Sequence, residues 1–240
     1  MGNFSLKFDK FWETFIKYNG YVKVLEGLKN TLTIAVLGLI IGIVIGTLIA
    51  TARVIPQYKV LPRILNKICS FYVALFRGTP IVVQLLVFYY VLLPLMGSRM
   101  TGIQVAVMVF GLNSAAYISE IMRGGIMSVD SGQMEAGRAV GLSFGTTMLK
   151  IVIPQAVKNI LPTMGNELIA LIKDTSVVSF VGATDLYVAF SFIGSSNYEF
   201  MVPYLVMALI YIVLVLIISF AIKLLELEPM TVAFAYPPMP

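Results

Sequence analysis

The chain has 240 residues, of which 59% are hydrophobic and 12% are charged, and its formal net charge is +5. Because a soluble globular domain carries about 25% charged residues, this composition excludes that class and predicts an integral membrane protein of one domain. There is no His, which removes the commonest general base and the commonest metal ligand. The single cysteine, Cys69, excludes an intrachain disulfide and a cysteine-cluster metal site. The excess of Lys and Arg is assigned to the cytoplasmic side of the membrane, and no nucleic-acid partner is expected.

The N-terminal region, residues 1–25, mixes lysines with aromatic residues such as Phe4, Phe8 and Trp12. This mixture is typical of an amphipathic segment lying at the membrane interface, which is the structure we expect here.

The first membrane span is predicted at 30–52, an uncharged run bounded by Lys29 and Arg53. About 20 apolar residues are enough to cross the hydrocarbon core as a helix. Small residues recur every four positions on one face of this span, which lets helix backbones approach closely in lipid. They are Gly38, Gly42, Gly46 and Ala50.

Residues 68–98 are apolar apart from Arg77, yet as one straight helix they would be about 46 Å long, too long for a core of about 30 Å. The tetrapeptide Arg77-Gly78-Thr79-Pro80 offers a break, with Thr79 as the N-cap and Pro80 as the first residue of the restarted helix.

Further spans are predicted at 100–119, 159–184 and 201–222, which gives an all-α protein with about five transmembrane helices. The membrane domain then covers 26–226 and leaves 227–240 as a C-terminal tail. The only long polar stretch between spans is 124–158. If this stretch is cytoplasmic, the inside carries nine Lys and Arg against six outside, which agrees with the positive-inside rule.

The polar stretch predicts a compact helical elbow. Asp130 and Gln133 have the spacing of a capping box, and Gly141 is suited to the left-handed conformation that ends a helix. A second short helix is expected to break near Pro154. Small residues keep the elbow slim enough for a partner's groove, and Glu135 and Arg138 are available for charged contacts.

The spacing of this stretch resembles the EAA signature of ABC importer permeases. Glu135-Ala136-Gly137 is followed after three residues by Gly141, and nine residues later by Ile151-Val152-Ile153-Pro154. Gly137 and Ile153 depart from the signature, which has Ala and Leu there. Further matches are similar to the polar amino acid branch, which includes the histidine, glutamine and arginine systems: Arg77-Gly78-Thr79-Pro80 with Gln84, Ala115-Ala116-Tyr117 with Glu120, Arg123-Gly124-Gly125-Ile126, Gly132-Gln133 and Lys173-Asp174-Thr175-Ser176.

The resemblance implies a type I ABC importer-like fold in a prokaryotic inner membrane, with the N-terminus outside and the C-terminus cytoplasmic. It also implies a second permease subunit, identical or paralogous, two ATPase subunits that use ATP and Mg, and an extracellular binding protein. Glu135, Ala136, Gly137, Arg138, Gly141 and Pro154 are then the ATPase-coupling residues. The chain itself has no phosphate-binding loop, so it is expected to be a transport subunit without catalysis and without a cofactor of its own.

Ionisable groups inside spans are costly and therefore call for a role. Arg77, beside a helix start at Thr79-Pro80, is suited to the carboxylate of an amino acid, and Gly78 and Thr79 are assigned to the same substrate path. On the third span Asn113, Tyr117 and Glu120 share one polar face, and Glu120 is suited to an ammonium group. The alternative is that Arg77 pairs with Glu120.

Lys173 and Asp174 are assigned to the same substrate path, in a gating or structural role. The predicted function is import of polar amino acids driven by a separate ATPase; basic amino acids are a candidate class among them, and the sequence does not fix which amino acid is carried. The alternative function is a secondary transporter or channel for amino acids that needs no ATPase.

Overall fold

The computed structural model describes the backbone of residues 4–235 and the side chains of residues 4–224. Within this part the chain is helical without strands. The α-helices are α1 (Phe4–Ile16), α2 (Gly20–Val54), α3 (Val60–Gly78), α4 (Ile81–Val87), α5 (Leu93–Leu95), α6 (Gly102–Met127), α7 (Ser131–Ala139), α8 (Phe144–Thr147), α9 (Ile153–Asp174), α10 (Leu186–Asn197) and α11 (Met201–Ala235). Two π-helical segments, Phe88–Leu92 and Met148–Val152, and one 3₁₀ segment, Thr175–Val181, connect some of them.

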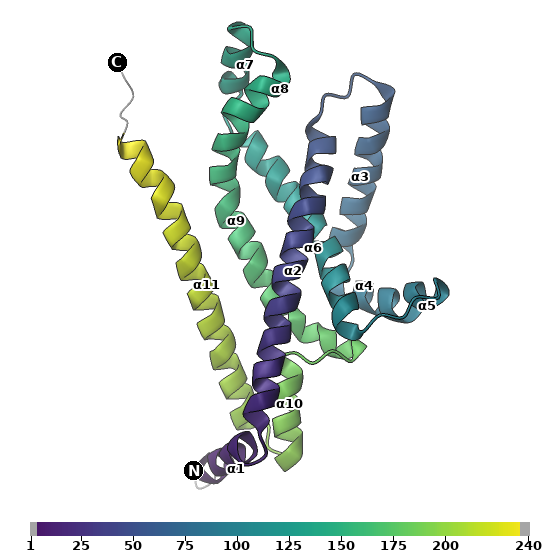
Figure 1. Ribbon diagram of the computed structural model, residues 1–240, viewed down its shortest axis with the longest axis vertical. Coiled ribbons are helices and arrows are strands. Elements are labelled where there is room, and N and C mark those ends of the chain that lie inside the picture. Colours follow the sequence, from purple (N-terminus) through teal and green to yellow (C-terminus); the bar gives the residue numbers. More distant parts are fainter. Residues whose placement is uncertain (1–3, 236–240) are drawn as a thin grey trace.

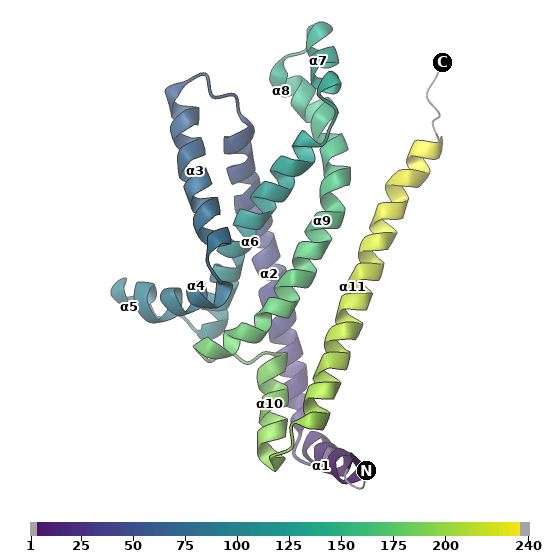
Figure 2. The same ribbon diagram turned by 180° about the vertical axis from the view of Figure 1, so that it is seen from behind.

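The expected number of spans is confirmed. Three helices, α2, α6 and α11, are long and apolar enough to cross a membrane, and two bent pairs raise the number to five if each pair is one span. One pair is α3 with the helical run Ile81–Leu95, and the other joins the run Phe144–Val181 to α10. Figures 1 and 2 show α1 and α10 at one end of the molecule and α7 and α8 at the other.

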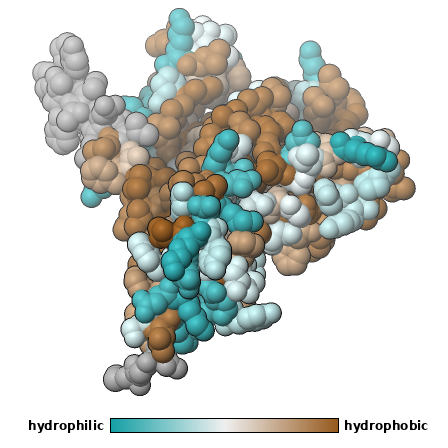
Figure 3. All heavy atoms as spheres, turned by 60° about the horizontal axis from the view of Figure 1, so that its bottom comes forward, coloured by the Kyte–Doolittle hydropathy of each residue, from teal (hydrophilic) through white to brown (hydrophobic). Residues whose placement is uncertain are grey.

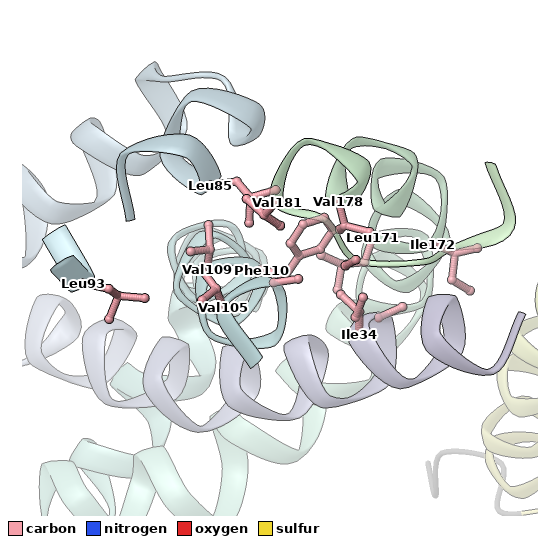
Figure 4. Close-up of a cluster of buried hydrophobic side chains, with 13 residues drawn as sticks. Ile34, Leu85, Leu93, Val105, Val109, Phe110, Leu171, Ile172, Val178 and Val181 are labelled. Atoms are coloured by element: carbon pink, nitrogen blue, oxygen red, sulfur yellow. The ribbon is translucent and has the colours of Figure 1, made fainter. Parts of the chain in front are cut away.

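The core forms around α6, which is the most deeply buried of the three long helices. The small-residue face of α2 packs on it, as its spacing predicted. A Cβ at Gly42 would come within 2.7 Å of Ser114 Oγ, and one at Gly46 within 3.0 Å of the Ala115 carbonyl oxygen. Beside this seam a cluster of buried apolar side chains joins α2, α4, α6, α9 and the 3₁₀ segment (Figure 4).

The second span is broken where the sequence predicted, and α3 and the following helical run meet at 106°. The restarted helix begins one residue later than expected: Pro80 is the N-cap of α4, and Thr79 closes α3 instead. The Thr79 hydroxyl donates to the Leu75 carbonyl oxygen at 2.8 Å, so its hydrogen is used within the last turn of α3, before the break.

Two boundaries differ from the sequence-based expectation. Helix α2 begins at Gly20, so the predicted boundary at 25 falls inside it and only α1 is a separate N-terminal helix. Helix α11 continues to Ala235, past the predicted boundary at 227, while residues 236–240 lie outside the described part. In both cases the helix extends beyond the uncharged run, because backbone hydrogen bonding continues after the helix has left the apolar layer.

Helix α10 was missed, since the segment between the fourth and fifth spans was expected to be a loop. Its signal is local: Asp185 caps the helix by accepting a hydrogen bond from the Val188 N–H at 2.9 Å. The residues that follow are largely apolar, and Leu186, Phe190 and Ile193 are fully buried.

Candidate substrate cavity and coupling elbow

The break between α3 and α4 opens into a cavity of about 510 Å³. This volume falls in the range of about 300–1,000 Å³ that small-molecule sites occupy. The cavity is lined from three sides: by the break itself, by α6 and by α9. The lining residues are Arg77, Gly78, Thr79, Pro80, Ile81, Asn113, Tyr117, Glu167, Ala170, Leu171 and Asp174.

Gln84 holds the break in shape. Its amide nitrogen lies 2.8 Å from the Phe76 carbonyl oxygen and 3.0 Å from that of Thr79, two carbonyls at the C-terminal end of α3. Its amide oxygen accepts a hydrogen bond from Asn113 Nδ2 at 2.9 Å. Asn113 is thus buried and hydrogen-bonded to the break, and it also lines the cavity. Gln84 appeared in the sequence as part of a family motif and was not assigned to the site.

Three ionisable groups line the cavity: Arg77, Glu167 and Asp174. The Arg77 guanidinium lies 5.3 Å from the centre of the Tyr117 ring, within reach of a cation–π contact. Among the side chains described, no ion pair joins Arg77 to either carboxylate. The cavity therefore combines one cation and two carboxylates that are not paired with one another.

The structure rearranges the predicted substrate path. It brings Arg77, Gly78, Thr79, Asn113, Tyr117 and Asp174 together. Lys173 is exposed and does not line the cavity, and Glu120 is bonded elsewhere, to Arg53 and Arg123. The predicted alternative, a pair of Arg77 with Glu120, is not formed either. Glu167 was noted only as a charged residue in a span, yet it stands seven residues before Asp174, on the same face of α9.

The coupling elbow consists of α7, α8 and the π-helical segment Met148–Val152. Asp130 caps α7 as predicted, but its side chain accepts from the Gly132 N–H at 2.7 Å, and no reciprocal bond from Gln133 completes a capping box. At the other end Gly141 has φ of +88°, the left-handed conformation that was expected. The N–H groups of Gly141 and Leu142 donate to the carbonyls of Arg138 and Gly137, which is the Schellman pattern.

Two further details of the elbow depart from expectation. Gly137 does not face outward: it is buried, and a Cβ there would come within 2.9 Å of Thr147 Oγ1, so α7 and α8 close on each other at this point. Pro154 does not break the chain but lies in the first turn of α9. The wider π turn that precedes it accommodates a residue without an N–H.

Most of the other residues that the sequence predicted for coupling lie on the outer surface of the elbow. Glu135, Ala136 and Arg138 are exposed, as is Pro154. The elbow stands at the end of the molecule opposite α1 (Figure 1).

A helical bundle with a broken second span and an exposed elbow defines a membrane transport subunit, and comparison with known proteins agrees. Residues 38–228 match the family described as binding-protein-dependent transport system inner membrane component. Because this match covers most of the chain, the chain belongs to that family. Its fold is that of type I ABC importer permeases, and ATP hydrolysis resides in a separate subunit of such systems.

Individual relatives narrow the comparison. The chain is 40% identical over 203 residues to the arginine transport system permease protein ArtQ of Bacillus subtilis, covering 85% of this chain and 90% of the relative. It is 36% identical over 204 residues to the glutamine transport system permease protein GlnP of Escherichia coli, covering 85% and 91%. Among solved structures, an amino acid ABC transporter crystallised with histidines matches with TM-score 0.81 and 35% identity over 90% of this chain and 97% of that one. The methionine transporter MetNI, at 20% identity and TM-score 0.72 over 85% and 95%, shares the fold.

Proposed function

We propose that this chain is the membrane-spanning subunit of an ATP-driven importer and that its cavity binds polar amino acids with a preference for cationic ones. The observation that carries the proposal is the charge of the cavity lining, one guanidinium and two carboxylates. A cationic amino acid presents the complement: one α-carboxylate, one α-ammonium group and one positive side chain. The named relatives, an arginine and a glutamine permease protein, support the class of substrate.

In this assignment Arg77 meets the α-carboxylate. The first turn of α4 begins beside it, and Gly78, which has open space around the position of a Cβ, leaves room for the ligand. Glu167 and Asp174 meet the two positive groups, and Tyr117 supplies an aromatic face to the cavity. Inside a membrane protein such groups are worth more than in water, because water competes less for them.

Coupling to the ATPase is assigned to the elbow formed by residues 130–154. Its exposed surface carries Glu135 and Arg138, and its shape is fixed by the bonds at Gly141 and by the contact of Gly137 with Thr147. The proposed partners are an ATPase dimer that uses ATP and Mg, a second permease subunit, identical or paralogous, and an extracellular amino acid binding protein.

The proposed orientation places α1 outside and the elbow in the cytoplasm of a prokaryotic cell. Figure 3, which looks toward the end that carries α1, shows hydrophilic side chains gathered there and hydrophobic ones on the flanks behind. Arg53 lies at the opposite end of α2, and Lys59 follows as the N-cap of α3. With this orientation nine Lys and Arg are inside against six outside, which agrees in sign with the positive-inside rule.

The test is uptake of labelled arginine, lysine and glutamine by the reconstituted complex. Arg77→Met should weaken all three alike, since every amino acid carries the α-carboxylate. Glu167→Gln and Asp174→Asn are compared, because one of these carboxylates meets the positive side chain and the other the α-ammonium group. Neutralising the first should harm arginine and lysine more than glutamine, by about ten-fold or more, since a charge-assisted hydrogen bond is worth about 1.5–3 kcal/mol, and neutralising the second should weaken all three alike. Glu26→Gln, an exposed carboxylate outside the cavity, is the matched control.

Equal loss of all three substrates in both Glu167→Gln and Asp174→Asn would contradict the preference for cations. Uptake that continues after ATP depletion would support the alternative, a secondary transporter or channel.

A further inference from the structure

Glu120 lies between two arginines at the elbow end of the bundle. One carboxylate oxygen pairs with Arg53 of α2, and the other accepts from Arg123 of α6, at 2.8 Å from Nη2 and 3.1 Å from Nε. The side chains of Glu120 and Arg53 are only 17% and 14% exposed, and that of Arg123 is 35% exposed. Ion pairs that are this sheltered are screened less by water and salt than surface pairs.

This cluster lies on the helix that joins the cavity to the elbow. Tyr117, which lines the cavity, precedes Glu120 by about one turn of α6, and α6 ends at Met127, about 10 Å beyond Glu120 at helical rise. Only three residues separate α6 from α7. Because this link is so short, a displacement of the elbow must also displace the end of α6.

Other bonds fasten the elbow to α9. The amide nitrogen of Gln155 donates to Gln133 Oε1 of α7 at 3.4 Å, and the Asn159 amide donates at 2.8 Å to Ser128 Oγ, in the link between α6 and the elbow. By contrast, the ion pair of Glu120 with Arg53 connects α6 to the end of α2. Immediately after that end a short link leads into α3, whose far end forms the break at the cavity.

We infer that Glu120 is a positioning residue for coupling: its bond to Arg53 makes the α2–α3 hairpin follow the elbow end of α6, so that displacement of the elbow reaches the cavity break. The role rests on the proposed coupling function of the elbow. It replaces the expectation from sequence that Glu120 binds the substrate. It also explains a charged cluster at a place where an apolar contact would satisfy packing alone.

The experiment uses the full complex in proteoliposomes with radiolabelled arginine as the probe. Glu120→Gln keeps the size of the side chain and removes its charge. We expect arginine transported per ATP hydrolysed to fall about ten-fold, while arginine affinity stays within two-fold of the parent. Glu120→Asp should retain part of the ratio, and Arg53→Glu/Glu120→Arg should recover part of it, since one pair between α2 and α6 is restored.

The matched control is Glu199→Gln, which removes an ion pair with Lys7 of 3.2 Å between α1 and the α10–α11 turn, at the other end of the molecule. It should leave the transport ratio unchanged. Loss of arginine affinity in Glu120→Gln at an unchanged ratio would assign Glu120 to the substrate and overturn the inference. Lower thermal stability of Glu120→Gln with an unchanged ratio of arginine transported to ATP hydrolysed would also overturn the inference, because Glu120 would then have a structural role only.

A separate variant, Glu135→Lys, tests whether the elbow couples the complex to the ATPase at all. If Glu135→Lys leaves capture of the ATPase and the transport ratio intact, the elbow is not the coupling site. If Glu135→Lys uncouples the complex and Glu120→Gln does not, only the positioning role of Glu120 is wrong.

Discussion

Replacement of Gln84 by leucine tests whether the broken second span depends on one buried amide. The side chain has nearly the same size in both residues, so the change removes hydrogen bonds without opening a large cavity. It leaves the carbonyls of Phe76 and Thr79 without their close donor and the Asn113 amide without its acceptor.

A buried polar group that loses its partner costs about 1–3 kcal/mol in soluble proteins, and polar contacts between membrane helices average about 0.6 kcal/mol. Phe76 O keeps a long contact with Asn113 Nδ2 at 3.4 Å, which limits its loss. Three weakened groups therefore give a total of about 2–4 kcal/mol. At about 2–4 °C per kcal/mol for a chain of this size, Tm should fall by about 4–16 °C.

The assay is thermal unfolding of the purified protein in detergent, combined with arginine affinity of the complex. Affinity should fall as well, because Thr79 and Asn113 line the cavity. Gln57→Leu, at an exposed position in the link between α2 and α3, is the control for the composition change. If Gln84→Leu and Gln57→Leu give the same Tm and the same affinity, the amide does not hold the break.

Three further changes test other parts of the molecule. Gly141→Ala should destabilise the elbow by about 1–2 kcal/mol, because φ of +88° is unfavourable for a residue with a Cβ. Gly145→Ala, in the helical turn of α8 with open space around it, should not destabilise it. The rate of limited proteolysis within 130–154 measures both variants, and equal rates would show that the left-handed conformation at Gly141 does not matter for stability. Trp12, the only tryptophan, is 52% exposed and lies with Phe8 and Phe4 on one side of α1. If this side contacts the membrane interface, phospholipids brominated near the headgroup should quench the Trp12 fluorescence in proteoliposomes. Quenching by aqueous iodide alone would place α1 away from lipid. In a Cys69→Ser background, Ser195→Cys should react with an impermeant thiol reagent from outside and Gly132→Cys only after permeabilisation, and the reverse pattern would invert the proposed orientation.

The signals that the sequence carries are local. The length of uncharged runs predicted the number of spans, and the proline-containing tetrapeptide at 77–80 predicted the break, because hydropathy and backbone restriction act over a few residues. The left-handed glycine at 141 and the small-residue face of α2 were readable for the same reason. The spacing of the elbow predicted the family.

Tertiary structure decided which side chains meet. Glu120 shares a polar face with Asn113 and Tyr117 in sequence, yet its partner Arg53 is 67 residues away, and no periodicity encodes that distance. Gly137 leaves room for Thr147, which packs against it, and Glu167 lines the cavity because α9 and the break between α3 and α4 share that cavity. Each of these contacts depends on where separate helices lie relative to one another. That arrangement follows from the packing of whole helix faces, so it cannot be inferred from the residues near any one position.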